Sequence, residues 1–198
     1  MAYMDIKLVV LEGGHVRLEP MTEAHVSGLA EIGVSQNFWD FMVYGKMENE
    51  EDMRGWVREI LARAEKGTDL PFVVIHLASG RVAGATRYLN IMPDDRGLEI
   101  GGTWYAPEFQ RTAVNTECKY LLLKHAFESL GCIRVQLKTD SRNERSQRAI
   151  ERIGAKKEGV LRNHMILPSG YIRHSVYYSI LDSEWSDVRT KLEGMLER

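Results

Sequence analysis

Alternation of apolar and polar residues predicts strands along much of the chain. In the clearest case, from Ile133 to Asp140, apolar residues or a threonine occupy every second position and charged or amide side chains lie between them. This pattern predicts a strand with one face toward a core. Similar patterns predict strands at His15–Glu19, Pro71–Leu77, Arg81–Leu89, Leu98–Tyr105, Glu158–Leu167 and Tyr171–Leu181.

Helices are predicted where apolar residues recur three and four positions apart and capping residues flank the run. The acidic run from Glu48 to Asp52 suits the start of one helix, because anionic side chains stabilise a helix N-terminus. Gly131 and Gly154 are placed as C-terminal caps of two others. The predicted helices are Thr22–Gly33, Glu48–Lys66, Asn115–Leu130, Glu144–Ile153 and, in the tail, Ser183–Arg198.

The order of these elements predicts the fold class. Short links that contain Gly80 and Gly97 join three consecutive strands, which predicts an antiparallel meander. The strand that ends at Tyr105, the following helix and the strand from Ile133 form a crossover, so these two strands are expected to be parallel. We expect an α/β (α+β) mixed sheet, mostly antiparallel, with one parallel crossover pair and flanking helices. Because 198 residues suffice for one core, we expect one domain over residues 1–198.

Composition argues against several classes of function. A formal net charge of -2 gives no bulk attraction to nucleic acid, and we predict no such partner. The chain shows no signal-peptide pattern and no stretch near the roughly 20 apolar residues of a membrane span, so we expect a cytoplasmic protein without a membrane partner. The histidines lack metal-motif spacing, and Cys118 and Cys132 are expected to pack in the core, so no metal is predicted.

One candidate binding site is the junction from Trp104 to Glu117, which leads from a strand into a helix. The first turn of a helix presents N–H groups that have no intrahelical acceptor, at the positive end of the helix dipole. Arg111 adds a side-chain cation. The junction is therefore a candidate site for a phosphate or pyrophosphate, although it contains no glycine-rich phosphate-loop motif.

A serine lies on the apolar face of the helix predicted at Glu144–Ile153. Ser146 shares that face with Ala149 and Ile153. Its hydroxyl either bonds back to the helix or caps the helix start, or it faces a ligand.

A carboxylate lies inside a predicted strand, next to two glycines. Glu99 precedes Gly101-Gly102, and paired glycines in a strand often mark a bulge or a close approach to the backbone. Glu99 is therefore either a base near such a site or a buried hydrogen-bonding strut. The aromatic segment Phe38–Tyr44 has two interpretations as well, because it either lines a pocket or anchors helices to the core.

Taken in order, these features resemble the GNAT acyltransferase superfamily, and within it the branch of ribosomal-protein N-terminal acetyltransferases named RimJ and RimL. The resemblance covers nearly the whole chain and is carried by Val16–Pro20, Glu99–Gly101, Trp104–Pro107, Asn143, Ser146 and Ile153–Arg162. It implies an acyltransferase that uses acetyl-coenzyme A as cosubstrate and an amine as acceptor. Because many relatives pair, a homodimer is expected on the same ground.

The resemblance also assigns residues to the coenzyme. In the family, the turn after the fourth strand holds the pyrophosphate, the pantetheine arm runs between the fourth and fifth strands, and a serine lies near the sulfur. One departure is that the family turn usually contains glycine, whereas Gln110–Asn115 contains none, and a Cβ limits how closely a phosphate approaches. The corresponding positions are Trp104, Tyr105, Gln110, Arg111, Thr112, Ala113, Val114, Asn115, Thr116, Asn143 and Ser146.

The expected reaction is direct attack of a neutral amine on the thioester in a ternary complex. Ser146 is the candidate proton donor to the leaving thiolate, with Tyr105 or Tyr88 as substitutes, and Glu99 is a candidate base acting through water. Near pH 7.5 an α-amine of pKa about 8 is about a fifth neutral, whereas a lysine amine of pKa about 10.4 is about a thousandth neutral. We therefore expect a peptide or protein α-amine as acceptor, contacted by Phe38, Trp39, Tyr44 and Tyr88.

Two alternatives stay open at this point. In one, the acceptor is a small molecule such as an amino acid or an aminoglycoside. In the other, the chain is a catalytically silent module that binds coenzyme A, which the glycine-free turn and the uncertain base both allow.

Overall fold

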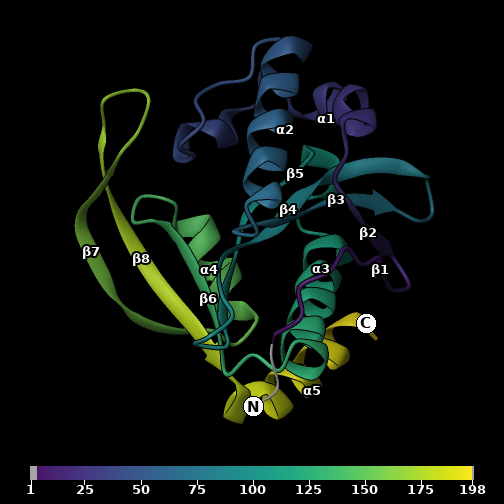
Figure 1. Cartoon of the computed structure of the whole chain (residues 1–198), viewed down its shortest axis with the longest axis vertical. Helices are drawn as coiled ribbons and strands as arrows, with labels where there is room; N and C mark the ends of the chain where they lie inside the picture. Colours follow the sequence, from purple (N-terminus) through teal and green to yellow (C-terminus); the bar gives the residue numbers. More distant parts are fainter. Residues whose placement is uncertain (1–3, 198) are drawn as a thin grey trace.

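A computed structural model describes residues 4–197, which contain an eight-stranded sheet in the order β1-β2-β3-β4-β5-β6-β8-β7 (Figure 1). Among these residues, β5 and β6 pair in parallel and the other neighbouring strands pair antiparallel. The strands are β1 (Leu11–Glu12), β2 (Val16–Pro20), β3 (Leu70–His76), β4 (Arg81–Met92), β5 (Gly97–Tyr105), β6 (Arg134–Asp140), β7 (Lys156–Ile166) and β8 (Ile172–Leu181).

Helices flank the sheet. One pair, α1 (Val26–Gly33) and α2 (Glu50–Glu65), packs together above β3 and β4, and a second pair, α3 (Ala113–Lys124) and α5 (Trp185–Leu196), packs together at the other end (Figure 1). A further helix, α4 (Glu144–Arg152), follows β6 and packs against it. The predicted fold class, a mostly antiparallel mixed sheet with one parallel crossover pair, is confirmed.

The predicted helix Asn115–Leu130 is wrong at both ends. It begins earlier because the Thr112 side chain caps the helix. The α-helix ends at Lys124, before the predicted end at Leu130, because a π-helical turn, His125–Ser129, follows it. Gly131, at φ 66°, then lets the chain leave this turn in a left-handed conformation that glycine adopts without strain.

Two short elements were not predicted at all. β1 has only two residues, and the aromatic segment contains a 3-10 turn, η2 (Asn37–Phe41). The β1–β2 turn depends on a contact distant in sequence, because the Glu117 carboxylate accepts hydrogen bonds from the N–H groups of Gly14, His15 and Val16 at 2.8, 2.7 and 2.7 Å. A local hydrophobic pattern carries no information about such a contact.

The core lies between the sheet and its helices. Both cysteines are buried and free, as predicted from the sequence. Within residues 4–197, no helix combines the length and apolarity needed to cross a bilayer.

Candidate active site

A cavity of about 790 Å³ lies where β5 and β6 separate. The two strands pair only over Gly97–Glu99 and Arg134–Gln136. Beyond these residues β5 continues to Tyr105 and β6 to Asp140, and both continuing stretches line the cavity. Strands that stop pairing leave backbone N–H and C=O groups free to bind a molecule placed between them.

The N-terminus of α3 forms one border of this cavity. Thr112 caps the helix, since its hydroxyl donates to the Phe109 carbonyl oxygen at 2.7 Å and accepts from the Val114 N–H at 3.3 Å. Arg111 has φ 63°, so the turn reaches a left-handed conformation without glycine. The remaining N–H groups of the first turn and the helix dipole favour an anion here.

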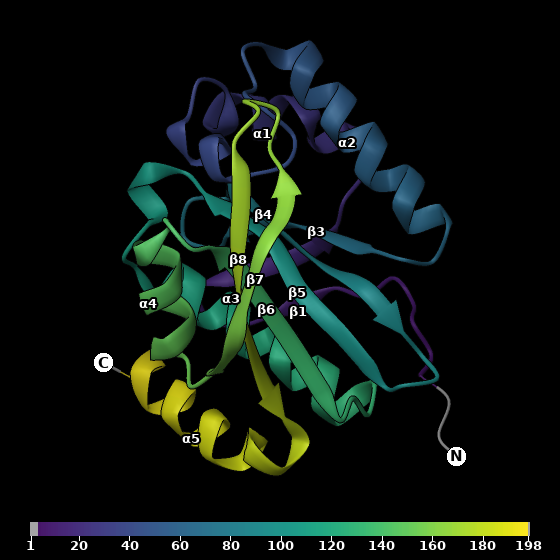
Figure 2. The same ribbon diagram turned by 90° about the vertical axis from the view of Figure 1, so that its left-hand side faces the viewer.

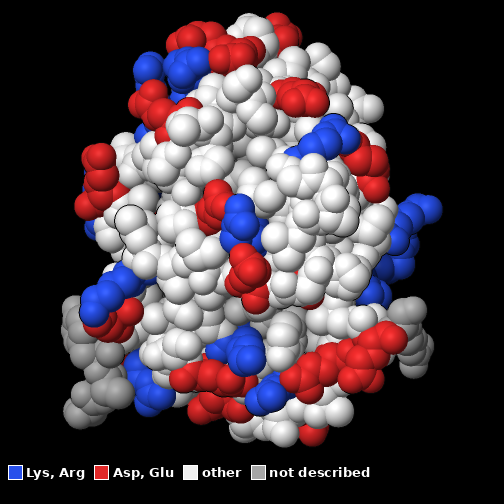
Figure 3. Space-filling view, turned by 90° about the vertical axis from the view of Figure 1, so that its right-hand side faces the viewer, with Lys and Arg blue, Asp and Glu red and all other residues white. Residues whose placement is uncertain are grey.

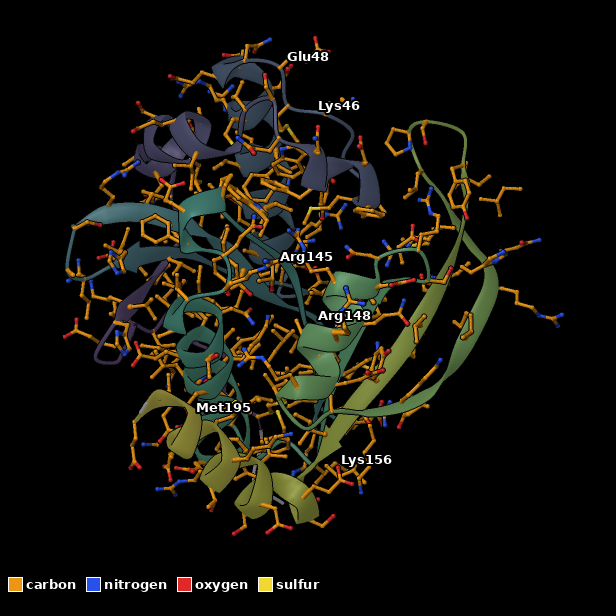
Figure 4. All side chains as sticks on the ribbon, turned by 180° about the vertical axis from the view of Figure 1, so that it is seen from behind. Lys46, Glu48, Arg145, Arg148, Lys156 and Met195 are labelled. Atoms are coloured by element: carbon orange, nitrogen blue, oxygen red, sulfur yellow. The ribbon has the colours of Figure 1, made fainter. Side chains whose placement is uncertain are left out.

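Arginines of α4 add positive charge to the same border. Arg145 Nη1 donates to Gln110 Oε1 at 2.7 Å, and Arg152 Nη2 donates to Thr116 Oγ1 at 2.8 Å, so α4 is bound to the start of α3. Figure 4 shows Arg145 and Arg148 on the first turns of α4, with α3 beside them. In contrast, cationic and anionic groups are interspersed on the face of the molecule away from the β7–β8 hairpin (Figure 3).

Ser146 lies in the first turn of α4 and lines the cavity. The cap of this helix is Asn143, whose Oδ1 accepts from the Ser146 N–H at 3.0 Å. Among residues 4–197 the Ser146 hydroxyl has no hydrogen-bond partner, so it neither caps the helix nor bonds back to it. This leaves the hydroxyl available to a ligand in the cavity.

Glu99 is buried in the cavity wall, with 2% of its surface exposed. Its Oε2 accepts from Asn90 Nδ2 at 3.0 Å, from Gln136 Nε2 at 2.9 Å and from Lys138 Nζ at 3.0 Å. These three bonds tie β5 to β4 and β6, so Glu99 acts as a strut. Oε1 accepts no hydrogen bond from residues 4–197, so the role of a base acting through water stays a prediction.

The bulge that the sequence indicated forms at Gly102, the second of the two glycines. Between Ala85 and Arg87 the β4–β5 register shifts, so Gly102 and Thr103 lie opposite one residue of β4, and Gly102 has φ 57°. A bulge releases backbone groups from the ladder. These groups border the cavity, close to where β5 leaves β6.

The sequence profile of the acetyltransferase (GNAT) domain matches residues 15–156. The chain belongs to the GNAT acetyltransferase family. The resemblance stated from the sequence is thereby confirmed, and so is the prediction of an acyltransferase.

Individual relatives agree with this membership. A solved structure from T. thermophilus, described only provisionally as an acetyltransferase, is 37% identical with a TM-score of 0.89 and covers 98% of this chain and 100% of that one. YdaF of Bacillus subtilis (strain 168), provisionally named a ribosomal N-acetyltransferase, is 35% identical over 109 residues, and the match spans 55% of this chain and 58% of YdaF. RimJ of Mycobacterium smegmatis in complex with CoA-disulfide shares the fold, with 19% identity, a TM-score of 0.80 and coverage of 95% and 93%.

Most of the residues that the GNAT resemblance assigned to the coenzyme lie together. Ala113, Val114 and Thr116 are the exceptions, because they do not line the cavity. Those that line it are Trp104, Tyr105, Gln110, Arg111, Thr112, Asn115, Asn143 and Ser146.

The aromatic segment serves both purposes that the sequence suggested. Phe38 and Tyr44 line the cavity, and Phe38 stacks on Trp104 with ring centroids 5.2 Å apart. Trp39, expected to contact the acceptor, is instead 1% exposed and donates its indole N–H to the Gly33 carbonyl oxygen at 2.7 Å. It anchors the segment to α1 and is not part of the cavity wall.

Two tyrosine hydroxyls proposed as proton donors are buried away from the cavity space. Tyr88 is 0% exposed, does not line the cavity, and donates to the Leu122 carbonyl oxygen at 2.6 Å. The Tyr105 hydroxyl is enclosed beside Cys118, and burial, together with this neighbour, raises its pKa well above the ordinary value. A proton donor must reach the reacting atoms, so neither hydroxyl is as well placed as that of Ser146.

Three buried cationic residues of the cavity were missed from the sequence. Lys119 of α3 is 6% exposed, its Nζ donates to Thr103 Oγ1 at 2.7 Å, and burial lowers its pKa to about 8. Arg87 and Arg173 are 4% and 7% exposed and also line the cavity. The sequence did offer a signal for the two arginines, because both occur within predicted strands. It offered none for Lys119, because a lysine in an amphipathic helix is normally solvated.

Proposed function

We propose that this protein transfers an acetyl group from acetyl-coenzyme A to the α-amine of a peptide or protein. The observation that carries the proposal is that one cavity, opened by the separation of β5 and β6, brings together the α3 N-terminus and the unpartnered Ser146 hydroxyl. GNAT membership supports the acetyl donor. The name of YdaF supports a ribosomal protein as acceptor.

The residues present fit acetyl-coenzyme A. A helix N-terminus and guanidinium groups are the usual donors to phosphate oxygens, and Arg111, Arg145, Arg148 and Arg152 all line this end of the cavity. Unpaired backbone of β5 and β6 offers hydrogen-bonding groups to the amides of a pantetheine arm. The glycine-free turn does not prevent such binding, because Arg111 already adopts the left-handed conformation.

In the proposed reaction the amine lone pair attacks the thioester carbonyl carbon and the carbon–sulfur bond breaks. Backbone N–H groups released by the bulge at Gly102 stabilise the charge that develops on the carbonyl oxygen. The Ser146 hydroxyl donates its proton to the leaving thiolate. The proton lost by the attacking amine returns to Ser146 through water, so the products are an amide and a free thiol.

An α-amine suits this site better than a lysine side chain. Carboxylates are much weaker bases than amines, so we expect the site to depend on acceptors whose amine is already neutral. About a fifth of α-amines of pKa about 8 are already neutral near pH 7.5, compared with about a thousandth of lysine amines. Cytoplasmic location and homodimer formation stay predictions from the sequence and the family.

A thiol-release assay with acetyl-coenzyme A and a panel of amines tests the proposal. The panel contains peptides with a free α-amine, lysine-containing versions of these peptides in which the α-amine is acetylated, an aminoglycoside and a polyamine. We expect thiol release with the free peptides and little with the others. Binding of acetyl-coenzyme A without release for any amine would contradict the proposed reaction and favour a silent coenzyme-binding module.

A further inference from the structure

The acceptor end of the cavity is formed by segments distant in sequence. The tip of the β7–β8 hairpin lies beside the segment that contains η2, above α4 (Figure 2). Arg173 Nη1 donates to the Phe41 carbonyl oxygen at 3.0 Å. The Arg142 guanidinium, between β6 and α4, lies over both the Tyr171 ring and the Phe41 ring, 3.4 and 5.7 Å from their centroids. This end lies opposite the α3 N-terminus, where the coenzyme phosphates are placed in our proposal.

Arg173 is a buried cation whose N–H groups are only partly used. It is 7% exposed, and besides the bond to Phe41 its Nε donates to Ser175 Oγ at 3.0 Å. Among residues 4–197 no carboxylate forms an ion pair with it, and Nη2 has no hydrogen-bond partner. Asp140 and Glu99 act on this charge from beyond ion-pair distance, and each already forms an ion pair with another cation. Because a buried charge without a direct partner is costly, we infer that an anionic ligand completes the site.

A second buried guanidinium adds to the positive charge at this end. Arg87 is 4% exposed, its Nε lies 2.9 Å from Asp69 Oδ2, and Nη2 bonds to the Tyr44 hydroxyl. Its Nη1 is buried and has no partner. Arg87 thus has a counter-ion but keeps an unused donor near Gly102, in the bulge of β5.

The carboxylates that line the cavity are already paired. Glu99 forms an ion pair with Lys138 at 3.0 Å, and Asp140 forms one with Arg142 at 2.7 Å. No free carboxylate is thus left among these residues to bind a second amine of a polycationic acceptor. At the acceptor end, Arg63 and Arg87 form ion pairs with Glu59 and Asp69, whereas Arg173 forms none with a carboxylate of the described residues.

Arg173 and Ser146 lie near the same end of β6. Asp140, the last residue of β6, pairs with Ser175 of β8, and Arg173 lies two residues farther along β8 toward the hairpin tip. Ser146 lies in the first turn of α4, which begins just after β6 ends. A carboxylate at Arg173 therefore belongs to the part of the acceptor close to the reacting amine.

We propose that the acceptor carries a carboxylate near its α-amine and that Arg173, assisted by Arg87, binds this carboxylate. The inference rests on the proposed function and names the acceptor class of that same site. Two sources share the required chemistry: the acidic side chain of a residue near a peptide N-terminus, and the α-carboxylate of a free amino acid.

The test compares acceptors that differ only in charge, at saturating acetyl-coenzyme A. One arm uses pentapeptide amides with Glu, Gln or Lys at the second position, and the other uses alanine and alanine amide. For one arm, we expect kcat/KM for the carboxylate-bearing acceptor to exceed that of its neutral isostere by about 10-fold or more, mainly through KM. The arm that shows the preference identifies the source.

Variants then assign the preference to Arg173. In R173Q we expect the Glu-over-Gln preference to disappear, because kcat/KM should fall more for the Glu peptide than for the Gln peptide. R173K, which keeps the charge but loses the planar fork, is expected to retain part of the preference. The matched control is R58Q, because Arg58 is exposed on α2 and does not line the cavity. Thermal unfolding shows whether each variant is folded.

Different failures have different meanings. Equal kcat/KM for acidic and neutral acceptors in both arms overturns the inference but leaves the proposed function intact. A preference in the wild-type protein that persists in folded R173Q overturns the role of Arg173. A higher KM for acetyl-coenzyme A in R173Q with no change toward acceptors overturns it as well. Absence of thiol release with every amine contradicts the proposed function itself.

Discussion

Replacing Lys119 by methionine should stabilise the folded protein near neutral pH. Lys119 is 6% exposed, and burial lowers the pKa of its amine from 10.5 to about 8. At about 1.4 kcal/mol per pKa unit, the folded state carries a penalty of about 3 kcal/mol wherever the amine is protonated in both the folded and unfolded states. The lost hydrogen bond to Thr103 offsets about 1 kcal/mol of the gain.

The sign of the pH dependence follows from which state binds the proton. Below pH 8 both states are protonated and the full penalty is present; between about 8 and 10.5 only the unfolded state holds the proton, so stability rises with pH. The advantage of K119M over the wild-type protein should therefore shrink by about 2 kcal/mol between about pH 7 and about pH 9.5.

Urea unfolding at both pH values measures this difference. K191M is the matched control, since Lys191 is an exposed lysine on α5 and its replacement should change stability equally at both pH values. A K119M advantage that does not depend on pH, or a variant less stable than the wild-type protein near pH 7 and more stable near pH 9.5, would refute the reasoning.

Three further predictions concern the site and its support. S146A should lower kcat by about 100-fold with little change in the dissociation constant of acetyl-coenzyme A, which stopped-flow and titration measurements separate. R145Q should raise that dissociation constant by about 10-fold without changing the KM of the acceptor, because the residue borders the proposed phosphate region. G13A should lose about 1–3 kcal/mol in urea unfolding, since its Cβ would lie 2.6 Å from Glu117 Oε1, whereas G159A, with nothing within 4 Å, should change stability little.

Local patterns predicted the elements that depend on local physics. The alternation from Ile133 to Asp140 matched β6 to within one residue, and the acidic run before α2 matched its start. The bulge at Gly101-Gly102 was predictable because glycines in a strand have few other uses. Ser146 was found because a hydroxyl on an apolar helix face is unusual.

What sequence reasoning missed depends on which face of the sheet a residue occupies. Tyr88 belongs to a correctly predicted strand, but alternation does not show that its ring packs under α3 while Arg87, one residue earlier, borders the cavity. Lys119 and Arg173 are notable only because of their burial, which arises when elements distant in sequence enclose them. The charge of the acceptor end was therefore accessible only from the fold.

Mass spectrometry of a peptide with one free α-amine and one internal lysine, incubated with acetyl-coenzyme A and the protein, shows which amine accepts the acetyl group. We expect a single acetyl group, located on the α-amine by fragmentation, and its loss in S146A. Acetylation of the lysine side chain with an unmodified α-amine, or no acetylation of any peptide, would contradict this expectation.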